Sequence, residues 1–145
     1  MRFWDSSAIV PLIVDEPASR GMRALLADDR AMLVWRLAGI EIVSALWRRA
    51  RVGDLNDASR FAAGRALGEL ERGWTSVENL AHTDWRARRL LALHPLRAAD
   101  ALHLAAALLA CEERPELLPS SPWRAGSAKP PGARGSPSRA EPHTR

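Results

Sequence analysis

Short apolar runs alternate with longer helix-like segments along residues 1–111, and this alternation restricts the fold more than any other feature. The runs MRFWD, AMLVW and WTSV predict three short strands, at residues 1–5, 31–35 and 74–77. Longer segments with helical spacing separate them. Alternating strands and helices are typical of an α/β domain with a parallel sheet, in which ligand sites lie at the carboxyl ends of the strands.

Helices are predicted between and after these strands. In residues 36–52 the apolar positions repeat at helical spacing and form one predicted apolar stripe: Leu37, Ile40, Val43, Leu46 and Trp47. Arginines gather near the end of this segment, where cations suit the helix dipole. The segment at 98–111 is apolar at all but two positions and should be interior. Other helices are expected at 8–14, 17–27, 59–73 and 80–93. Trp4, Trp35 and Trp47 lie within apolar segments and are predicted to be buried.

The net charge of +4 comes from one end of the chain. Residues 120–145 hold five of the 21 basic residues and one of the 17 acidic ones, so residues 1–119 carry 16 of each sign. The high pI is therefore weak support for a nucleic-acid-binding face. Half of the 26 residues in 120–145 are Pro, Gly or Ser, which predicts a disordered tail after one domain at 1–119. No signal peptide or membrane-spanning run is visible, so a cytoplasmic protein is expected.

Three carboxylates lie inside otherwise apolar segments: Asp5 in RFWDSSAIVPLIV, Glu41 in RLAGIEIVSALW and Asp100 in LRAADALHLAAALLAC. An unpaired carboxylate is costly to bury, whereas one metal ion can serve all three. Mg²⁺ prefers oxygen ligands, can polarise a phosphodiester and can help to activate a water molecule. The pattern therefore favours metal-dependent phosphodiester hydrolysis.

Two of these acids also have a structural interpretation. Asp5 could cap the helix that follows it or form a turn. Glu41 could pair with a nearby arginine such as Arg36 or Arg48. Asp100 is harder to explain without a ligand, because alanines and a leucine flank it. The three positions together favour the metal site.

Further residues near these acids are open to two interpretations. His103 follows Asp100 by three residues and could be a hydrogen-bond donor close to the metal. A core histidine bonded to a backbone carbonyl is the favoured alternative. Arg48, Arg49 and Arg51 could contact a phosphate backbone, although a solvated helix end is the favoured interpretation.

In order and spacing, FWDSSAIVPLIVDEP, LAGIEIVSALWRRARVGDL and LRAADALHLAAAL resemble the first three motifs of PIN-domain ribonucleases of the VapC toxin type. The resemblance spans residues 1–119. It implies an αβα sandwich with a parallel central sheet, and Mg²⁺- or Mn²⁺-dependent cleavage of RNA. It also implies inhibition by a VapB-type antitoxin, and a homodimer. Asp5, Glu41 and Asp100 match the family's acidic metal-site positions, and Ser7 matches a polar position close to the metal.

The resemblance ends at Pro119. Members of the family continue into a strand resembling FVTLD, which brings a fourth acid, and then into RRL and a helix. Here a polar segment follows instead. With the reading frame moved by one base, codons for residues 120–127 can spell FVTLERRL, and we hypothesise that an out-of-frame tail replaced the last strand and helix. The coding DNA tests this idea, which fails if the shifted frame encodes no apolar strand and helix.

The altered end leaves more than one function open. An active toxin ribonuclease is the first interpretation. A catalytically impaired remnant that only binds the antitoxin or another subunit is the second, because a missing strand would expose a sheet edge and remove one acid. A helical adaptor without a metal is the third.

Overall fold

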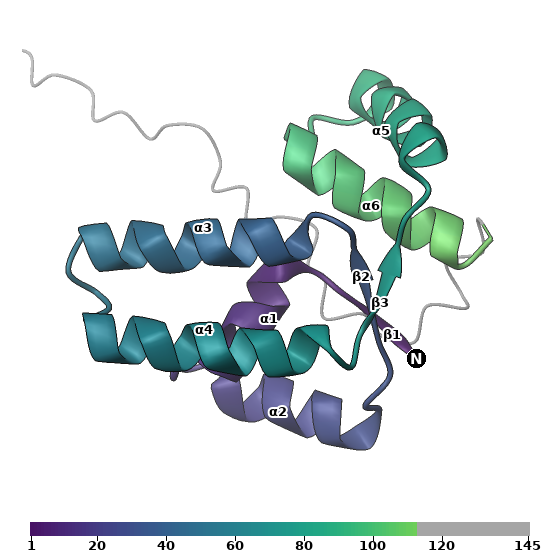
Figure 1. The fold of residues 1–145 in the computed structure, drawn as a ribbon. Coiled ribbons are helices and arrows are strands. Elements are labelled where there is room, and N and C mark those ends of the chain that lie inside the picture. Colours follow the sequence, from purple (N-terminus) through teal and green to yellow (C-terminus); the bar gives the residue numbers. More distant parts are fainter. Residues whose placement is uncertain (113–145) are drawn as a thin grey trace, which may run out of the picture.

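The computed structural model describes residues 1–112, which form a parallel three-stranded sheet covered by helices (Figure 1). The strands β1 (Arg2–Trp4), β2 (Met32–Trp35) and β3 (Thr75–Val77) lie in the order β1-β2-β3. Trp4 pairs with Val34, and Trp35 pairs with Val77. The helices are α1 (Ser6–Ile13), α2 (Ser19–Asp28), α3 (Ala38–Arg51), α4 (Asp57–Glu71), α5 (Leu80–Leu93) and α6 (Ala98–Ala110). The predicted α/β class with a parallel sheet is confirmed.

Different helices cover the two faces of the sheet, because successive side chains of a strand point to opposite sides. One face packs against α1 to α4, and the other packs against α6, with α5 lying on α6 (Figure 1). The αβα sandwich that the motifs implied is therefore present. The side chains on the first face are Trp4, Met32 and Val34, and those on the second are Phe3, Leu33 and Trp35.

The side of helix α3 that is buried is not the predicted one. Trp4 and Trp35 are buried as predicted, but Trp47 is 45% exposed. Arg60 of α4 lies over the Trp47 ring, 4.0 Å from its centroid. The helix carries two apolar stripes, and helical spacing alone does not tell which one meets the core. The buried stripe consists of Ala38, Ile42 and Leu46, and the exposed one of Ile40, Val43 and Trp47.

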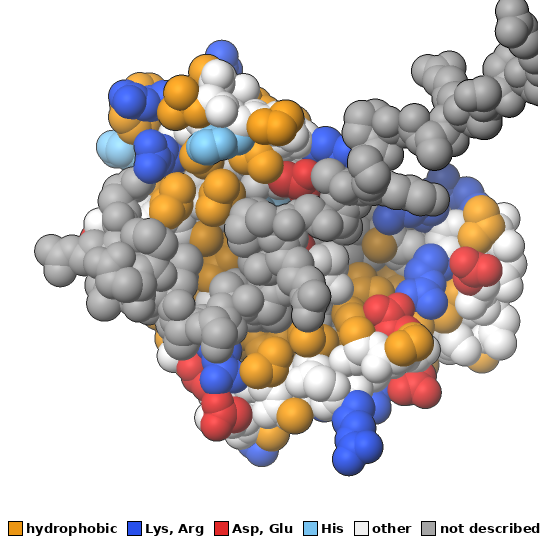
Figure 2. Space-filling view, turned by 180° about the vertical axis from the view of Figure 1, so that it is seen from behind, with side chains coloured by type: hydrophobic (Ala, Val, Ile, Leu, Met, Phe, Trp, Pro, Cys, Tyr) orange, Lys and Arg blue, Asp and Glu red, His pale blue; other side chains and the backbone are white. Residues whose placement is uncertain are grey.

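The charge of the chain is not gathered into one basic face in the view of Figure 2, where basic, acidic and hydrophobic side chains are intermixed. This agrees with the balanced charge of residues 1–119. The predicted tail at 120–145 and the replaced strand and helix lie outside the described residues. Among residues 1–112, no helix is both long enough and apolar enough to cross a membrane.

Candidate active site

A cavity of about 610 Å³ lies at the carboxyl end of the sheet and is lined by Asp5, Glu41 and Asp100. Asp5 directly follows β1, Glu41 is in the first turn of the helix after β2, and Asp100 is in the first turn of α6. All three are partly buried. Parallel strands place the segments that follow them at the same edge of the sheet, so acids far apart in the sequence meet here.

Asp5 occupies the N-cap position of α1, but its side chain makes no hydrogen bond to the helix backbone. Two neighbouring hydroxyls bind its carboxylate instead. Ser7 Oγ donates to Asp5 Oδ2 at 2.5 Å, and Ser6 Oγ lies 3.4 Å from Asp5 Oδ1. Ser7 thus lies beside the proposed metal-site acid, while the contact of Ser6 was not predicted. Helix capping does not account for the Asp5 side chain.

His103 joins two of the three acids. Its Nε2 lies 2.5 Å from Glu41 Oε2, and its Nδ1 lies 3.3 Å from Asp5 Oδ1. The side chain is only 3% exposed, and Nδ1 has no hydrogen bond with suitable geometry in residues 1–112. A neutral imidazole donates from one nitrogen, whereas an imidazolium can donate toward both carboxylates. The favoured prediction of a backbone carbonyl partner for His103 is therefore wrong.

The opposite charges of Glu41 and His103 outweigh the cost of burying them. Burial alone would raise the pKa of Glu41, but the hydrogen bond and the positive charge of His103 bring it below its usual 4.5. Burial alone would lower the pKa of His103, but the bond to Glu41 and the charges of Asp5, Glu41 and Asp100 raise it above its usual 6.5. The site thus favours a carboxylate next to an imidazolium.

Two arginines of α3 also line the cavity, and within residues 1–112 one of them, Arg49, is paired with an acid. Arg49 Nη1 lies 2.8 Å from Glu16 Oε2, and both residues line the cavity. Arg48 lines it too, but not as the predicted partner of Glu41, which contacts His103 instead. Arg36 pairs with Glu78 at 2.9 Å, outside the cavity.

The carboxylates supply oxygen donors of the kind that Mg²⁺ prefers. Within residues 1–112, however, no three His, Cys, Asp or Glu side chains are grouped closely enough to hold one ion together. His103 engages one oxygen of the Glu41 carboxylate, Oε2. Mg²⁺ usually keeps several of its waters and can be bound through only one or two carboxylates. The donor set therefore fits the ion chemically.

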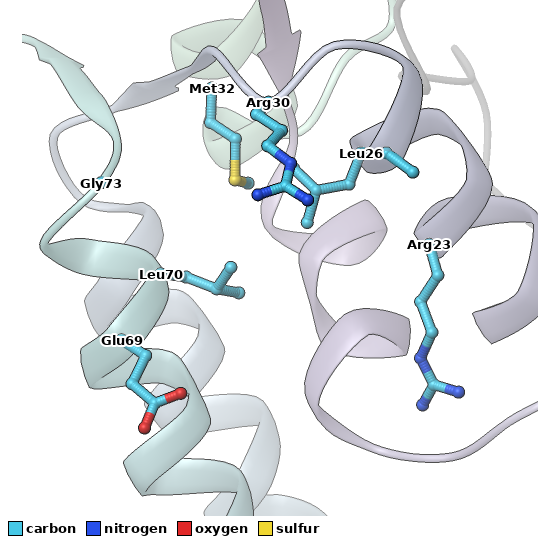
Figure 3. Close-up of a pocket in the computed structure, with 8 residues that line it drawn as sticks. Arg23, Leu26, Arg30, Met32, Glu69, Leu70 and Gly73 are labelled. Atoms are coloured by element: carbon cyan, nitrogen blue, oxygen red, sulfur yellow. The ribbon is translucent and has the colours of Figure 1, made fainter.

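A second cavity, of about 340 Å³, lies at the opposite end of the sheet. Met32 begins β2 and Gly73 precedes β3, so this is the amino end of the strands. Figure 3 shows Leu26, Met32 and Leu70 pointing toward a common space. Glu69 is its only acidic lining residue in the described part of the chain. The carboxylate cluster belongs to the first cavity alone.

No family model matches the chain. Two curated proteins of Mycobacterium tuberculosis are similar to it: ribonuclease VapC45 of strain CDC 1551 / Oshkosh and ribonuclease VapC49 of strain ATCC 25618 / H37Rv. Each is 37% identical over 106 residues, which are 73% of this chain and 74% of the relative. Both names describe a ribonuclease, in agreement with the resemblance of the three motifs.

Proposed function

Because this chain belongs to the VapC family of ribonucleases, we propose that it is the toxin of a toxin–antitoxin pair and hydrolyses phosphodiester bonds of RNA. The proposed site is the cavity at the carboxyl end of the sheet. The observation that carries the proposal is the meeting of Asp5, Glu41 and Asp100 at this cavity from three separate segments. A soluble domain has no structural need to gather three partly buried acids in one place, since they repel one another.

Mg²⁺ is the proposed cofactor, with Mn²⁺ as the alternative. Asp5, Glu41 and Asp100 would hold it, one or two of them directly and the remainder through its waters. When bound, the ion would polarise the phosphodiester and offset the negative charge of the phosphate and of the acids. The support is the set of carboxylate oxygens that three partly buried acids bring to one cavity.

The neighbouring side chains orient these acids before RNA binds. Ser7 donates to one oxygen of Asp5, and His103 contacts Glu41 from the inner side of the cavity. Each contact removes rotational freedom from a carboxylate, so less reorganisation is needed when a phosphate arrives. As an imidazolium, His103 also offsets part of the acidic charge. His103 and Ser7 are therefore positioning residues in this proposal.

A VapB-type antitoxin is the proposed inhibitor, and a second copy of the chain is the proposed dimer partner. Both assignments rest on the family. The exposed apolar stripe of α3, formed by Ile40, Val43 and Trp47, offers contact area to a protein partner. Size-exclusion chromatography with light scattering, with and without the antitoxin, measures both assemblies.

The direct test is cleavage of a labelled single-stranded RNA by the purified full chain in Mg²⁺, in Mn²⁺ and in EDTA. We expect cleavage with either metal, none in EDTA, and suppression by the antitoxin. Antitoxin binding without cleavage in either metal would replace the proposal with that of an impaired, binding-only remnant. Cleavage that persists in EDTA would reject the metal.

A further inference from the structure

Arg48 differs from the other arginines of α3 in its surroundings. Positions four and seven residues apart lie on one side of a helix, and Glu41, Ala45 and Arg48 all line the acidic cavity. Arg51 does not line it, and Arg49 is held by Glu16. Arg48 is exposed and makes no ion pair or side-chain hydrogen bond with any residue of 1–112.

The other charges of the cavity do not attract a phosphate. Within residues 1–112, four acids line it: Asp5, Glu16, Glu41 and Asp100. Arg49 contacts one of these acids, and His103 contacts two. An approaching RNA backbone is therefore repelled by the site itself. Among the described lining residues, Arg48 is the one cation whose hydrogen-bond donors are all free.

We infer that Arg48 binds a phosphate of the RNA strand beside the phosphodiester that is cleaved, and so positions the strand over the acids. This inference rests on the proposed function. Arg48 lies seven positions after Glu41 on α3, which places their backbones about 10 Å apart along the helix. That separation suits a flanking phosphate better than the cleaved one. A guanidinium can hold a phosphate with two parallel hydrogen bonds.

The test compares Arg48→Gln with Arg51→Gln, a matched loss of charge on the same helix outside the cavity. Binding of a fluorescent single-stranded RNA to the full chain is followed by anisotropy in EDTA over a series of salt concentrations. In Arg48→Gln we expect roughly tenfold weaker binding, the loss expected for one charge-assisted contact. The slope of the logarithm of the association constant against the logarithm of the salt concentration is negative, and it should become shallower by about 0.7. This is the contribution of one phosphate contact with a single strand.

Two further readouts separate positioning of RNA from a structural role. Arg48→Lys should restore the salt slope, because it keeps the charge. In the cleavage assay, Arg48→Gln should raise KM and leave kcat unchanged, as expected for a contact that is equally strong in the ground state and the transition state. A lower kcat at unchanged KM would overturn the inference.

The binding assay needs no metal and no chemistry, so its failure is distinguishable from failure of the proposed function. Equal salt slopes for Arg48→Gln and Arg51→Gln, in a chain that cleaves RNA, would overturn the role of Arg48 alone. Unchanged RNA binding with weakened antitoxin binding would overturn it too, and would assign Arg48 to the protein partner. A wild-type chain that neither binds nor cleaves RNA would overturn both.

Discussion

The two ends of the sheet carry cavities that differ in their acidic side chains. Within residues 1–112, four acids and a buried histidine line the cavity at the carboxyl end. One acid, Glu69, lines the cavity at the amino end, where Leu26, Met32 and Leu70 point toward a common space (Figure 3). Two arginines line each cavity in this part of the chain. The strands are parallel, so the segments that follow them converge at one edge, and their polar side chains meet there. The amino end lacks this convergence of acids, and its cavity lies between α2, β2 and α4.

The largest expected difference between the two ends is in catalysis. Asp5→Asn removes one acid from the carboxyl end and should lower RNA cleavage by on the order of 100-fold or more, as loss of a charge-stabilising group does in other active sites. Glu69→Gln makes the same chemical change in the second cavity and should leave the cleavage rate unchanged. Initial rates on labelled RNA in saturating Mg²⁺ measure both variants.

Circular dichroism spectra of the two variants serve as the folding control. If Asp5→Asn and Glu69→Gln were both folded and lost cleavage equally, the two cavities would not differ in their role in catalysis. Undiminished cleavage by Asp5→Asn would reject the assignment of the site.

Metal binding gives the next effect in size. A ligand that binds only the folded state stabilises it by about 2.7 kcal/mol when present at 100 times its dissociation constant. Mn²⁺ should therefore raise the Tm of the wild-type chain by several degrees, and EDTA should reverse the shift. Differential scanning fluorimetry should find a much smaller shift in Asp5→Asn and a full shift in Glu69→Gln. An equal shift in all three proteins would locate the ion elsewhere.

Much of this arrangement could be predicted from local pattern, and the exceptions have physical reasons. The strands and helices follow from short-range periodicity. Acids in apolar segments can also be recognised from the sequence without knowledge of their partners. Pairing between distant segments does not show in such patterns. The contact of His103 with Glu41 joins residues 62 positions apart, and the histidine's own neighbours suggest only an apolar core.

The exposed side of α3 was mispredicted for a related reason. Ile42 and Trp47 both belong to apolar stripes of one helix, and the core accepts only one of them. The choice depends on where α1 and α4 pack, which is a tertiary property. Arg48 and Arg51 were likewise alike in sequence, and only the fold separates the arginine that lines the cavity from the one that does not.

The third prediction concerns the histidine that only the carboxyl-end cavity contains. His103→Leu leaves Glu41 partly buried without its partner, which should lower the free energy of unfolding in EDTA by about 1–3 kcal/mol. His94→Leu changes an exposed histidine at the end of α5 and should stay within about 0.5 kcal/mol of wild type. Urea denaturation measures both. Equal stability of the two variants would show that the Glu41 contact contributes nothing.

The same pair predicts a pH dependence. Folding lowers the pKa of Glu41. Its contribution to the free energy of unfolding is therefore present above pH 4.5, the usual pKa, and is lost as pH falls through the folded pKa. The pKa of His103 is raised by folding, so its contribution is full below 6.5 and is lost as pH rises through its folded pKa. The stability difference between wild type and His103→Leu in EDTA should therefore be largest between pH 4.5 and 6.5. A difference that does not change with pH would mean that the pair is uncharged.

The smallest expected effect comes from filling the amino-end cavity. Ala27→Leu places a larger side chain at an exposed position on the lining of this cavity, and surface substitutions usually change stability by no more than about 0.5 kcal/mol. RNA cleavage should not change. Ala45→Leu makes the identical substitution on the lining of the acidic cavity and should slow cleavage by narrowing the space beside Glu41. If Ala27→Leu instead slowed cleavage as much as Ala45→Leu, the cavity at the amino end would be part of the RNA-binding surface. The two ends of the sheet would then not be functionally separate.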